Sequence, residues 1–322
     1  MELSLSPSDA QSTTRHALIT GIRGFTGEYL AQTLSASGYR VSGTRVPEGT
    51  TAQTDGTDPS ILSLDITDEA ACIALIDRVR PSHIVHLAAR TFVADDDALG
   101  FYRSNVLGTL NLLQACAKVG HVPERIVIAS SANIYGNAAG TIDERCVAAP
   151  VNHYGASKLA MECLVRTWED RLPIVITRPF NYTGQHQSVR FLIPKIVSHF
   201  IQKKDRIELG NLDVVRDFSD VRYVADVYKG LLENQAAIGQ TVNICSESEH
   251  ALGNVIDLCR ELSGQSIDVQ VNPAFVRANE IKFLIGSAEK LRRLVPDAHP
   301  IALRDTLAWM LAEVPGNGNG RN

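Results

Sequence analysis

The sequence has little that would point to an extracellular, membrane or nucleic-acid-binding protein. Its 322 residues include only six cysteines, none in a C-x-x-C pair or at metal-ligand spacing, so we expect reduced cysteines in a cytoplasmic protein. No run reaches the roughly 18 apolar residues of a membrane span, and the polar segment 1–15 predicts neither a signal peptide nor an anchor. The formal net charge of −5 argues against a nucleic-acid-binding surface.

The sequence does have a globular composition and a regular alternation of apolar runs with helical segments. Hydrophobic residues make up 44% of the chain and charged residues 21%, both ordinary for a soluble globular protein. Buried strands are predicted, with helices between them, at 17–20, 40–43, 61–65, 84–87, 125–130 and 174–178. Strands joined by crossover helices predict an α/β fold with a doubly wound parallel sheet, whose ligands bind beyond the carboxyl ends of the strands.

The pattern changes after Pro179. Residues 181–190 are polar and predict a loop, and the segments beyond them predict a smaller C-terminal α/β domain that binds the substrate. The expected nucleotide-binding domain comprises residues 14–181 and about 219–246, the substrate-binding domain 182–218 and 247–314, and the flexible ends 1–13 and 315–322.

A glycine-rich turn directly follows the first predicted strand. Gly21, Gly24 and Gly27 have the spacing G-x-x-G-x-x-G. Glycines permit a tight turn and a close backbone approach, and the helix that starts there would face an anion with its amino terminus. The turn therefore predicts a site for the phosphates of a nucleotide, with a glycine-rich turn that binds no ligand as the simpler alternative.

The end of the second predicted strand indicates which nucleotide is bound. NAD-binding folds often place an acidic residue there for the ribose 2′-hydroxyl, but residues 41–45 contain none. Arg45, together with Arg23 in the glycine turn, could hold a 2′-phosphate instead, which favours NADP(H) over NAD(H); the alternative is that both arginines are merely exposed. Asp65 is expected either to accept a hydrogen bond from the adenine amine or, like Asp68, to cap a helix.

Tyr154 and Lys158 stand four residues apart on a predicted helix, 152–170, and so share one face. A nearby ammonium would lower the pKa of the phenol from about 10 toward working pH, so that the tyrosine could exchange a proton with a substrate oxygen. Ser131, at the end of the fifth predicted strand, could hydrogen-bond the same oxygen. The alternatives are an ordinary surface pair and a serine that satisfies a strand end.

Seven segments, in the same order along the chain, resemble the extended short-chain dehydrogenases/reductases, in the branch that acts on nucleotide sugars. They are Thr20–Gly27, Asp65–Ile66, His86–Ala89, Asn105–Thr109, Ser130–Gly136, Tyr154–Lys158 and Arg178–Asn181. The resemblance implies a Rossmann-type sheet, an NADP(H)-dependent oxidoreductase and a homodimer that pairs through helices near 106–118 and 152–170.

The resemblance also implies roles for individual residues. Tyr154 would be the catalytic acid/base, Lys158 would tune it and hold the nicotinamide ribose, and Ser131 would bind the reacting oxygen. Asn105 would support the helix that carries Tyr154, and Asn181 would touch the sugar or its diphosphate. The implied cofactor contacts are Gly21, Arg23, Gly24, Phe25, Thr26, Gly27, Arg45, Asp65, Ile66, Leu87, Ala88, Ala89, Asn105, Tyr154, Lys158 and Pro179.

Three segments of the C-terminal half, 211–221, 243–246 and 277–287, resemble GDP-mannose 4,6-dehydratases and GDP-4-keto-6-deoxy-D-mannose reductases. By this resemblance Arg216 and Arg277 would contact the diphosphate, for which bidentate arginines are suited, and Glu280 would contact a ribose hydroxyl. Lys195 and Arg190 would help, or are solvated surface charges. The implied substrate contacts are Thr91, Ser131, Ala132, Asn133, Asn181, Lys195, Arg216, Arg277 and Glu280.

The two residues after Ser131 bear on the reaction. Dehydratases of this family carry an acidic or polar residue and a glutamate there, but Ala132 and Asn133 cannot act as a general acid or base. Nucleotide-sugar 4-epimerases also lack that pair, but they typically keep NAD bound, which the missing acid after the second strand disfavours. The expected reaction, in deoxysugar biosynthesis, is NADPH-dependent reduction of the C4 ketone of a GDP-4-keto-6-deoxyhexose to GDP-D-rhamnose or GDP-6-deoxy-D-talose. Thr91, Phe92 and Val93 are expected to help set the sugar face.

Other functions stay open as alternatives. They are a nucleotide-sugar 4-epimerase, a relative of GDP-mannose 4,6-dehydratase, and a non-enzymatic NADPH-binding sensor or scaffold. The intact set of Ser131, Tyr154 and Lys158 argues against the non-enzymatic alternative.

Overall fold

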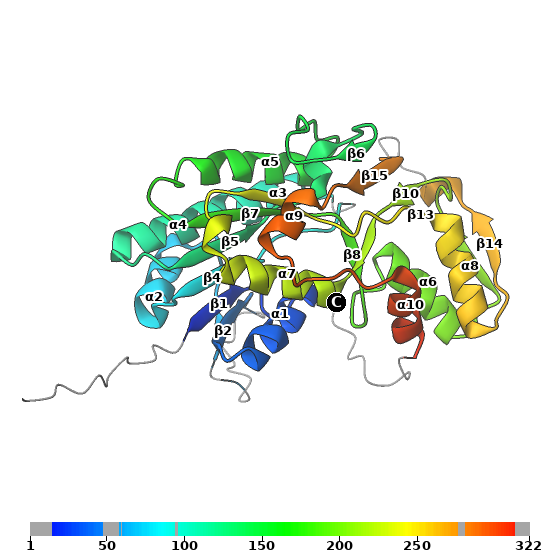
Figure 1. Ribbon diagram of the computed structural model, residues 1–322, viewed down its shortest axis with the longest axis horizontal. Coiled ribbons are helices and arrows are strands. Elements are labelled where there is room, and N and C mark those ends of the chain that lie inside the picture. The colour runs from blue at the N-terminus through cyan, green and yellow to red at the C-terminus, as the bar shows by residue number, and fades with distance from the viewer. Residues whose placement is uncertain (1–14, 48–57, 59, 94–95, 276–280, 313–322) are drawn as a thin grey trace, which may run out of the picture.

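The protein is built around a seven-stranded parallel sheet (Figure 1). The computed structural model describes residues 15–47, 58, 60–93, 96–275 and 281–312. In the order of the sheet, the strands are β12 (Thr241–Ile244), β7 (Ile174–Pro179), β5 (Arg125–Ala129), β4 (His83–His86), β1 (His16–Thr20), β2 (Arg40–Arg45) and β3 (Ile61–Ser63). The order reverses between β1 and β4, and sheets of this kind bind ligands at the reversal. The prediction of a doubly wound, Rossmann-type sheet is confirmed.

Helices cover both faces of this sheet, because alternate residues of a strand point to opposite sides. From β1, Ala17 and Ile19 join a core with α1 and α7, whereas Leu18 joins a core with α2, α4 and α5 on the other face. All three side chains are fully buried. The helices are α1 (Phe25–Ala36), α2 (Glu69–Val79), α4 (Gly108–Val119), α5 (His153–Arg166) and α7 (Val221–Glu233).

Two short elements that the sequence does not predict precede α4. α3 (Ala98–Tyr102) leads into η1 (Arg103–Leu107), a single π-helical segment. Such wide turns inside helices are rare and are frequent at functional sites. This one carries the buried side chain of Asn105.

Three further helices collect at one end of the sheet, on the right of Figure 1. α6 (Leu192–Ile201), α8 (Leu252–Ser263) and α10 (Leu303–Leu311) share an apolar core with the paired strands β9 (Arg206–Leu209) and β14 (Asp268–Val271). The buried residues of that core come only from 193–218 and 252–310. This packing supports the expected division of the chain, whose domain boundaries stay a prediction.

Short strands connect this end with the central sheet. β8 (Asn181–Thr183) pairs with β11 (Phe218–Asp220), so the loop predicted for residues 181–190 is wrong for its first three residues. A four-stranded sheet has the order β13-β10-β15-β6. Its strands are β6 (Thr141–Ile142), β10 (Val215–Arg216), β13 (His250–Ala251) and β15 (Phe283–Gly286), and α9 (Glu289–Leu294) follows them. Strands of two or three residues are too short to show an apolar period in the sequence.

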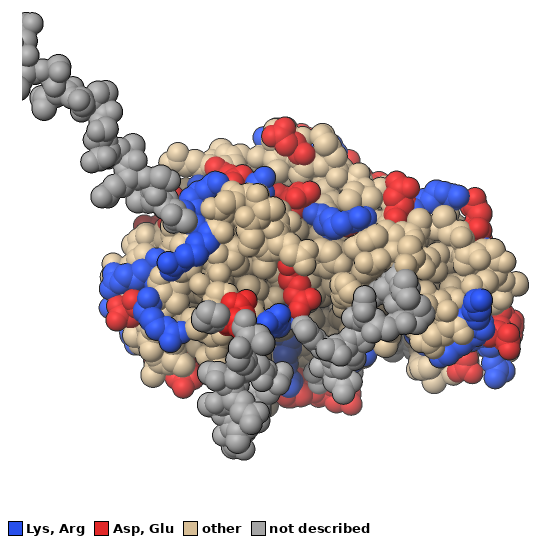
Figure 2. Space-filling view, turned by 90° about the horizontal axis from the view of Figure 1, so that it is seen from below, with Lys and Arg blue, Asp and Glu red and all other residues tan. Residues whose placement is uncertain are grey.

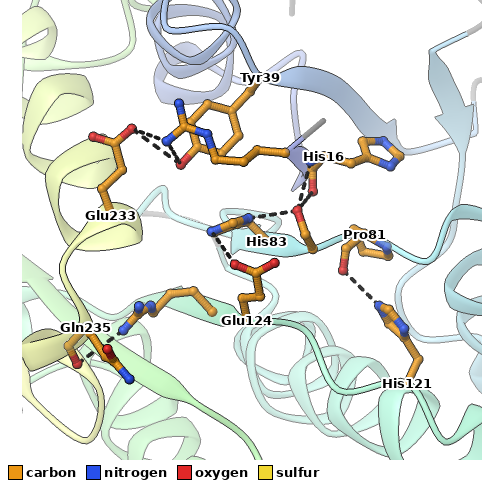
Figure 3. A network of polar contacts seen from close by, with 11 residues as sticks. His16, Tyr39, Pro81, His83, His121, Glu124, Glu233 and Gln235 are labelled. Atoms are coloured by element: carbon orange, nitrogen blue, oxygen red, sulfur yellow. Dashed lines mark hydrogen bonds and ion pairs between the residues drawn. The ribbon is translucent and has the colours of Figure 1, made fainter. Parts of the chain in front are cut away.

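A polar network, drawn in Figure 3, holds the amino ends of the central strands together. Ser82 Oγ accepts a hydrogen bond from the His16 amide at 2.8 Å and lies 2.9 Å from His83 Nδ1. Beside them, Arg15 donates to Glu233 of α7 at 2.8 Å. These contacts fasten β1 and β4 to α7 at the edge of the sheet opposite the glycine turn.

The surface carries charges of both signs. In the view from below, Lys and Arg side chains lie among Asp and Glu side chains (Figure 2). Several exposed charges form ion pairs, such as Arg304 with Glu261 and Lys118 with Glu69. Among the described helices, none is long and apolar enough to cross a membrane.

We expect the stability of the fold to fall in mild acid. Burial is the main cause that lowers the pKa of both His16 and His83. The unfolded chain then takes up protons near pH 6.5, whereas the folded chain does so only at lower pH, so the stability from the neutral imidazoles is full above about 6.5 and is lost as the pH falls below it. The urea midpoint is predicted to drop between about pH 7.5 and pH 5.5.

A pair of matched variants tests whether the buried histidines cause this fall in the urea midpoint. His83→Gln removes a buried imidazole and should make the drop smaller, whereas His299→Gln, at an exposed histidine, should leave it unchanged. An equal drop in both variants would show that other groups cause it.

Candidate active site

Close backbone contacts shape the glycine turn and leave no room for side chains. Gly21 has φ +73°, which L residues rarely adopt, and a Cβ on it would lie 3.1 Å from the backbone of Ala88 after β4. A Cβ on Gly27 would lie 2.5 Å from the Gly21 carbonyl oxygen, and that oxygen accepts a 2.9 Å hydrogen bond from the Gly24 amide. The turn therefore lies at the reversal point of the sheet, next to the end of β4.

The first turn of α1 has amide groups available for an anion. Its N-cap, Gly24, makes no side-chain hydrogen bond to the helix, and the first amides of any helix lack partners within it. The positive end of the helix dipole lies at the same place. The bare glycine turn and the uncapped helix fit the diphosphate of a dinucleotide cofactor.

Arg23 and Arg45 lie on adjacent segments, as a 2′-phosphate site requires. The residue before Arg23 donates its amide to the carbonyl of the residue before Arg45, at 3.0 Å. Arg23 is exposed and Arg45 is half-buried. Sequence reasoning missed Asp58, whose carboxyl pKa is lowered mainly by hydrogen bonds from Ser60 and also by Arg23.

The structure separates the two roles considered for Asp65 and Asp68. Asp68 caps α2 by accepting a 3.0 Å hydrogen bond from the Ala71 amide. Asp65 is exposed, and its carboxylate accepts from the amide and hydroxyl of Thr67 at 2.9 and 2.7 Å. Helix capping therefore belongs to Asp68, while the adenine contact of Asp65 stays a prediction; the neighbouring Ile66 is buried.

The segment after β4 lies on the other side of the glycine turn. The amides of Leu87 and Ala88 both donate to Thr20 Oγ1 at 3.1 Å. Thr20 is the last residue of β1, and Leu87, Ala88 and Ala89 are half-buried. The predicted cofactor residues from β1 and β4 are thus brought to one place.

Tyr154 and Ser131 meet at the carboxyl end of β5. Ser131 follows that strand and caps the short helix η2 (Ala132–Tyr135) by accepting a 3.2 Å hydrogen bond from the Asn133 amide. Tyr154 lies in the first turn of α5, which Asn152 caps. Ser131 and Tyr154 are only 6% and 8% exposed, and their side chains lie near enough for Ser131 to lower the pKa of the phenol.

The predicted lowering of the pKa of Tyr154 is wrong. Burial raises this pKa to about 12, against the opposite effect of Ser131, and Tyr182 raises it as well. The Lys158 ammonium instead donates to the Ala129 carbonyl at 2.7 Å. The phenol is therefore held in its protonated form, which suits a proton donor.

Lys158 is buried beside an ion pair that sequence reasoning missed. Burial lowers the pKa of Lys158 to about 8, although Glu162, one helical turn further on, raises it. Glu162 accepts two hydrogen bonds from Arg178 of β7, at 2.9 and 2.6 Å. Two features of the sequence could have indicated this ion pair. A glutamate follows Lys158 by four residues, and an arginine lies inside an apolar strand.

Asn105 makes the contact that its predicted supporting role requires. Its Nδ2 donates to Ser157 Oγ at 2.9 Å, and Ser157 Oγ donates to the Tyr154 carbonyl at 2.8 Å. Its Oδ1 accepts from the Arg90 amide at 2.9 Å. Asn105 thereby links the segment after β4 to the first turn of α5.

A missed aromatic residue borders the cofactor turn. Tyr182, directly after the exposed Asn181, stacks on Phe25 with ring centroids 5.9 Å apart. Its hydroxyl lies 2.7 Å from Thr26 Oγ1. Pro179, three residues before Tyr182, is the last residue of β7 and is buried. The predicted sugar-binding segment thus directly contacts the predicted cofactor turn.

The segment after β4 also reaches the second half of the chain. The Arg190 guanidinium lies 4.1 Å from the ring centroid of Phe92, and the Phe191 ring meets Phe92 edge-on. Thr91 is exposed. These contacts place Phe92, one of the three residues expected to set the sugar face, against the start of α6.

Among the residues predicted to bind the nucleotide part of the substrate, Lys195 and Arg216 lie in the described part of the chain. Lys195 donates to a backbone carbonyl of β9 at 2.8 Å, and Arg216 to a carbonyl of its own strand at 2.9 Å. Arg277 and Glu280 lie outside the described residues. Their contacts stay predictions.

The positions that distinguish a dehydratase carry no acid. Ala132 is 1% exposed and belongs to the apolar core, so its side chain faces the core rather than an open surface. Asn133 is half-buried and its Nδ2 donates to Ser131 Oγ at 3.2 Å. Neither side chain can exchange a proton at C6 of a sugar.

Ser130, before Ser131, has a buried hydroxyl without a hydrogen-bond partner among the described residues. Buried polar groups are normally paired, so this hydroxyl is an exception among the described residues. In the described part of the chain, no group of three or more His, Cys, Asp and Glu residues could hold a metal ion.

Comparisons with known proteins match most of the chain to enzymes with nucleotide-sugar names. The sequence profile described as GDP-mannose 4,6 dehydratase matches residues 18–296. GDP-6-deoxy-D-talose 4-dehydrogenase from Aggregatibacter actinomycetemcomitans is 34% identical over 276 residues, covering 85% of this chain and 89% of that enzyme. GDP-6-deoxy-D-mannose reductase from Pseudomonas aeruginosa is 30% identical over 312 residues, covering 93% of this chain and 97% of that enzyme.

Two solved structures are similar over the same length. A Burkholderia cenocepacia protein, provisionally assigned as an epimerase, has a TM-score of 0.84 and 46% identity, covering 92% of this chain and 97% of its own. RMD from Pseudomonas aeruginosa, complexed with NADPH, has a TM-score of 0.80 and 28% identity, covering 92% of this chain and 98% of its own.

We expect activity to fall above about pH 8, where Lys158 loses its charge. The second-order rate constant with the nicotinamide cofactor as varied substrate reports the free protein and should decline about tenfold per pH unit beyond that point. Between about pH 8 and 10.5 the unfolded chain holds this proton more tightly than the folded chain, so loss of the Lys158 proton by itself raises the stability of the fold as the pH rises. A melting temperature that holds while activity falls supports the assignment; constant activity to about pH 10 contradicts it.

Proposed function

The chain belongs to the GDP-mannose 4,6-dehydratase family of extended short-chain dehydrogenases/reductases, and we propose that it reduces the C4 ketone of a GDP-4-keto-6-deoxyhexose with NADPH. The observation that carries the proposal is the buried pair Tyr154 and Ser131, which lie near enough for Ser131 to lower the pKa of the phenol. The pair places a protonated phenol beside a hydroxyl at the carboxyl end of β5, at the same edge of the sheet as the predicted cofactor turn.

The residues divide the work of a carbonyl reduction. Bound NADPH supplies the hydride that is added to C4. Ser131 binds O4 of the ketone, and Tyr154 gives its proton to that oxygen as the negative charge develops there. The products are the C4 alcohol, NADP⁺ and the Tyr154 phenolate, which regains its proton from water before the next turnover. Lys158 keeps a positive charge near the site below about pH 8, and this charge stabilises a nearby anion such as the phenolate left by proton transfer.

The electrostatics favour reduction over oxidation. A phenol whose pKa is raised to about 12 by burial is almost wholly protonated at neutral pH. It can give a proton at once, whereas oxidation of an alcohol would first require a phenolate. Ala132 and Asn133 offer no acid or base for removing water, so the family's dehydratase reaction is not proposed.

NADP(H) is proposed over NAD(H). Support comes from the adjacent Arg23 and Arg45 and from the solved relative that is complexed with NADPH. Relatives that carry GDP-sugar names support a GDP-linked deoxyhexose as substrate. The cytoplasmic location and the homodimer stay expectations.

A nucleotide-sugar 4-epimerase is the second candidate, favoured by the name of the 46% identical relative. It would use the same tyrosine and serine but would show no net use of NADPH. Incubation with GDP-4-keto-6-deoxymannose separates the two, and NMR of the product assigns D-rhamno or 6-deoxy-D-talo configuration at C4.

Replacing the proposed proton donor tests the mechanism. Tyr154→Phe should lower kcat by about 10²–10⁴-fold, the usual size of general acid catalysis, with little change in nucleotide-sugar affinity. Tyr39→Phe, at the opposite edge of the sheet (Figure 3), should turn over like the wild type. Normal turnover by Tyr154→Phe would overturn the mechanism. If the wild type consumes no NADPH with GDP-, dTDP- or UDP-linked 4-keto sugars, the sensor or scaffold alternative is favoured.

Replacing Arg45 tests the cofactor preference. Arg45→Ala should raise KM for NADPH about 10- to 100-fold, the size of a lost charge-assisted hydrogen bond, and leave KM for NADH nearly unchanged. Arg40→Ala, at the other end of the same strand, is the matched control and should change neither value. Equal effects of Arg45→Ala on both cofactors would contradict a 2′-phosphate contact.

A further inference from the structure

A chain of buried hydrogen bonds runs from the glycine turn to the catalytic helix through His86, for which the proposed function has no role. Thr20 Oγ1 lies 2.7 Å from His86 Nδ1, and His86 Nε2 lies 3.0 Å from Thr109 Oγ1. Thr109 Oγ1 donates to the Asn105 carbonyl at 2.7 Å. Asn105 then continues to Ser157 and so to the carbonyl of Tyr154. All the side chains that form this chain are 3% exposed or less.

The direction of these hydrogen bonds is fixed at the Thr109 end. Thr20 Oγ1 accepts from the Ala88 amide and from the Leu87 amide, which it shares with the Thr20 carbonyl. Its own hydrogen is thus free for His86 Nδ1, which accepts it because the Thr109 end places the ring proton on Nε2. The ring carries its proton on Nε2 and donates to Thr109, because the hydrogen of Thr109 is given to the Asn105 carbonyl.

Protonation of His86 would break this arrangement. A hydrogen on Nδ1 would compete with the amide hydrogens of Leu87 and Ala88 for Thr20 Oγ1. Burial is the main cause that lowers the pKa of His86, to about 3, and the positive charge of Lys158 lowers it further by opposing a second positive charge. Geometry and charge thus select one neutral tautomer.

We propose that His86 is a positioning residue, which as a fixed neutral imidazole ties the start of the phosphate turn to the helix that carries Tyr154. One side of the ring holds Thr20, directly before Gly21. The other side holds Thr109 and, through Asn105 and Ser157, the backbone of Tyr154. Each side therefore serves a different part of the proposed reaction, NADPH binding and proton transfer.

The tautomer can be read directly by NMR of the protein labelled with ¹⁵N-histidine. We expect one of the nine histidines, assigned to His86 by its loss in His86→Asn, to stay neutral with Nε2 protonated between about pH 5 and 9. An Nδ1-protonated ring, or titration of this residue in that range, would overturn the inference. This readout depends on no enzymatic activity, so it also stands if the proposed function fails.

Two variants test the two sides of the ring separately. His86→Asn keeps an acceptor near the Nδ1 position, so NADPH affinity should stay near wild type while kcat falls about tenfold. His86→Gln keeps a donor near the Nε2 position, so kcat should stay within about threefold while the Kd for NADPH rises about tenfold; both sizes follow from one unpaired buried group.

A matched control separates positioning from simple loss of stability. Thr177→Val removes a buried hydroxyl of β7 that lies outside this chain of hydrogen bonds. It should lower the melting temperature without a change in kcat or in NADPH affinity. Equal losses of kcat and NADPH affinity in His86→Asn and His86→Gln would contradict the division of roles. If neither variant folds, Thr109→Ser and Thr109→Val decide: kcat should hold in the first and fall in the second.

Discussion

The structure depends on the parallel pairing of β1 with β4, where the order of the sheet reverses. Their register sets Thr20 opposite His86, so the glycine turn after one strand and the half-buried segment after the other open at the same edge. Gly21 can approach Ala88 only because it lacks a side chain. The opposite edge is closed by the polar network of Figure 3. The site therefore follows from strand order and one close backbone contact.

Burial sets the electrostatics of the site. The same removal from water raises the pKa of Tyr154 and lowers that of Lys158, because both neutral forms are favoured away from solvent. The phenol is thereby kept as a proton donor, and the ammonium keeps its charge near neutral pH with the help of Glu162. A buried ion pair contributes little stability by itself, but here Glu162–Arg178 compensates charge next to the reacting groups.

Much of the fold and site could be predicted from the sequence, because long apolar strands and the glycine spacing are local patterns. The central sheet, the turn at Gly21 and the helix of Tyr154 could be predicted from such local patterns. The short strands β6 and β8 and the π-helical segment at Asn105 could not be predicted, because they depend on contacts between segments that are far apart in the sequence. The pKa of Tyr154 was predicted in the wrong direction because spacing on a helix gives proximity but not burial. The i,i+4 spacing of Glu162 after Lys158 was visible in the sequence, but its pairing with Arg178 and the stacking of Tyr182 on Phe25 follow only from the packing of strands and helices.

The central claim is that Tyr154 completes a net hydride transfer to C4 of a GDP-linked 4-keto-6-deoxy sugar. The most direct test is to supply NADPH deuterated at the transferred position of nicotinamide C4 and to examine the product by NMR. The account predicts one deuterium at C4 of the sugar, with stoichiometric formation of NADP⁺. A product without deuterium at C4, or an altered sugar without NADPH consumption, would contradict it.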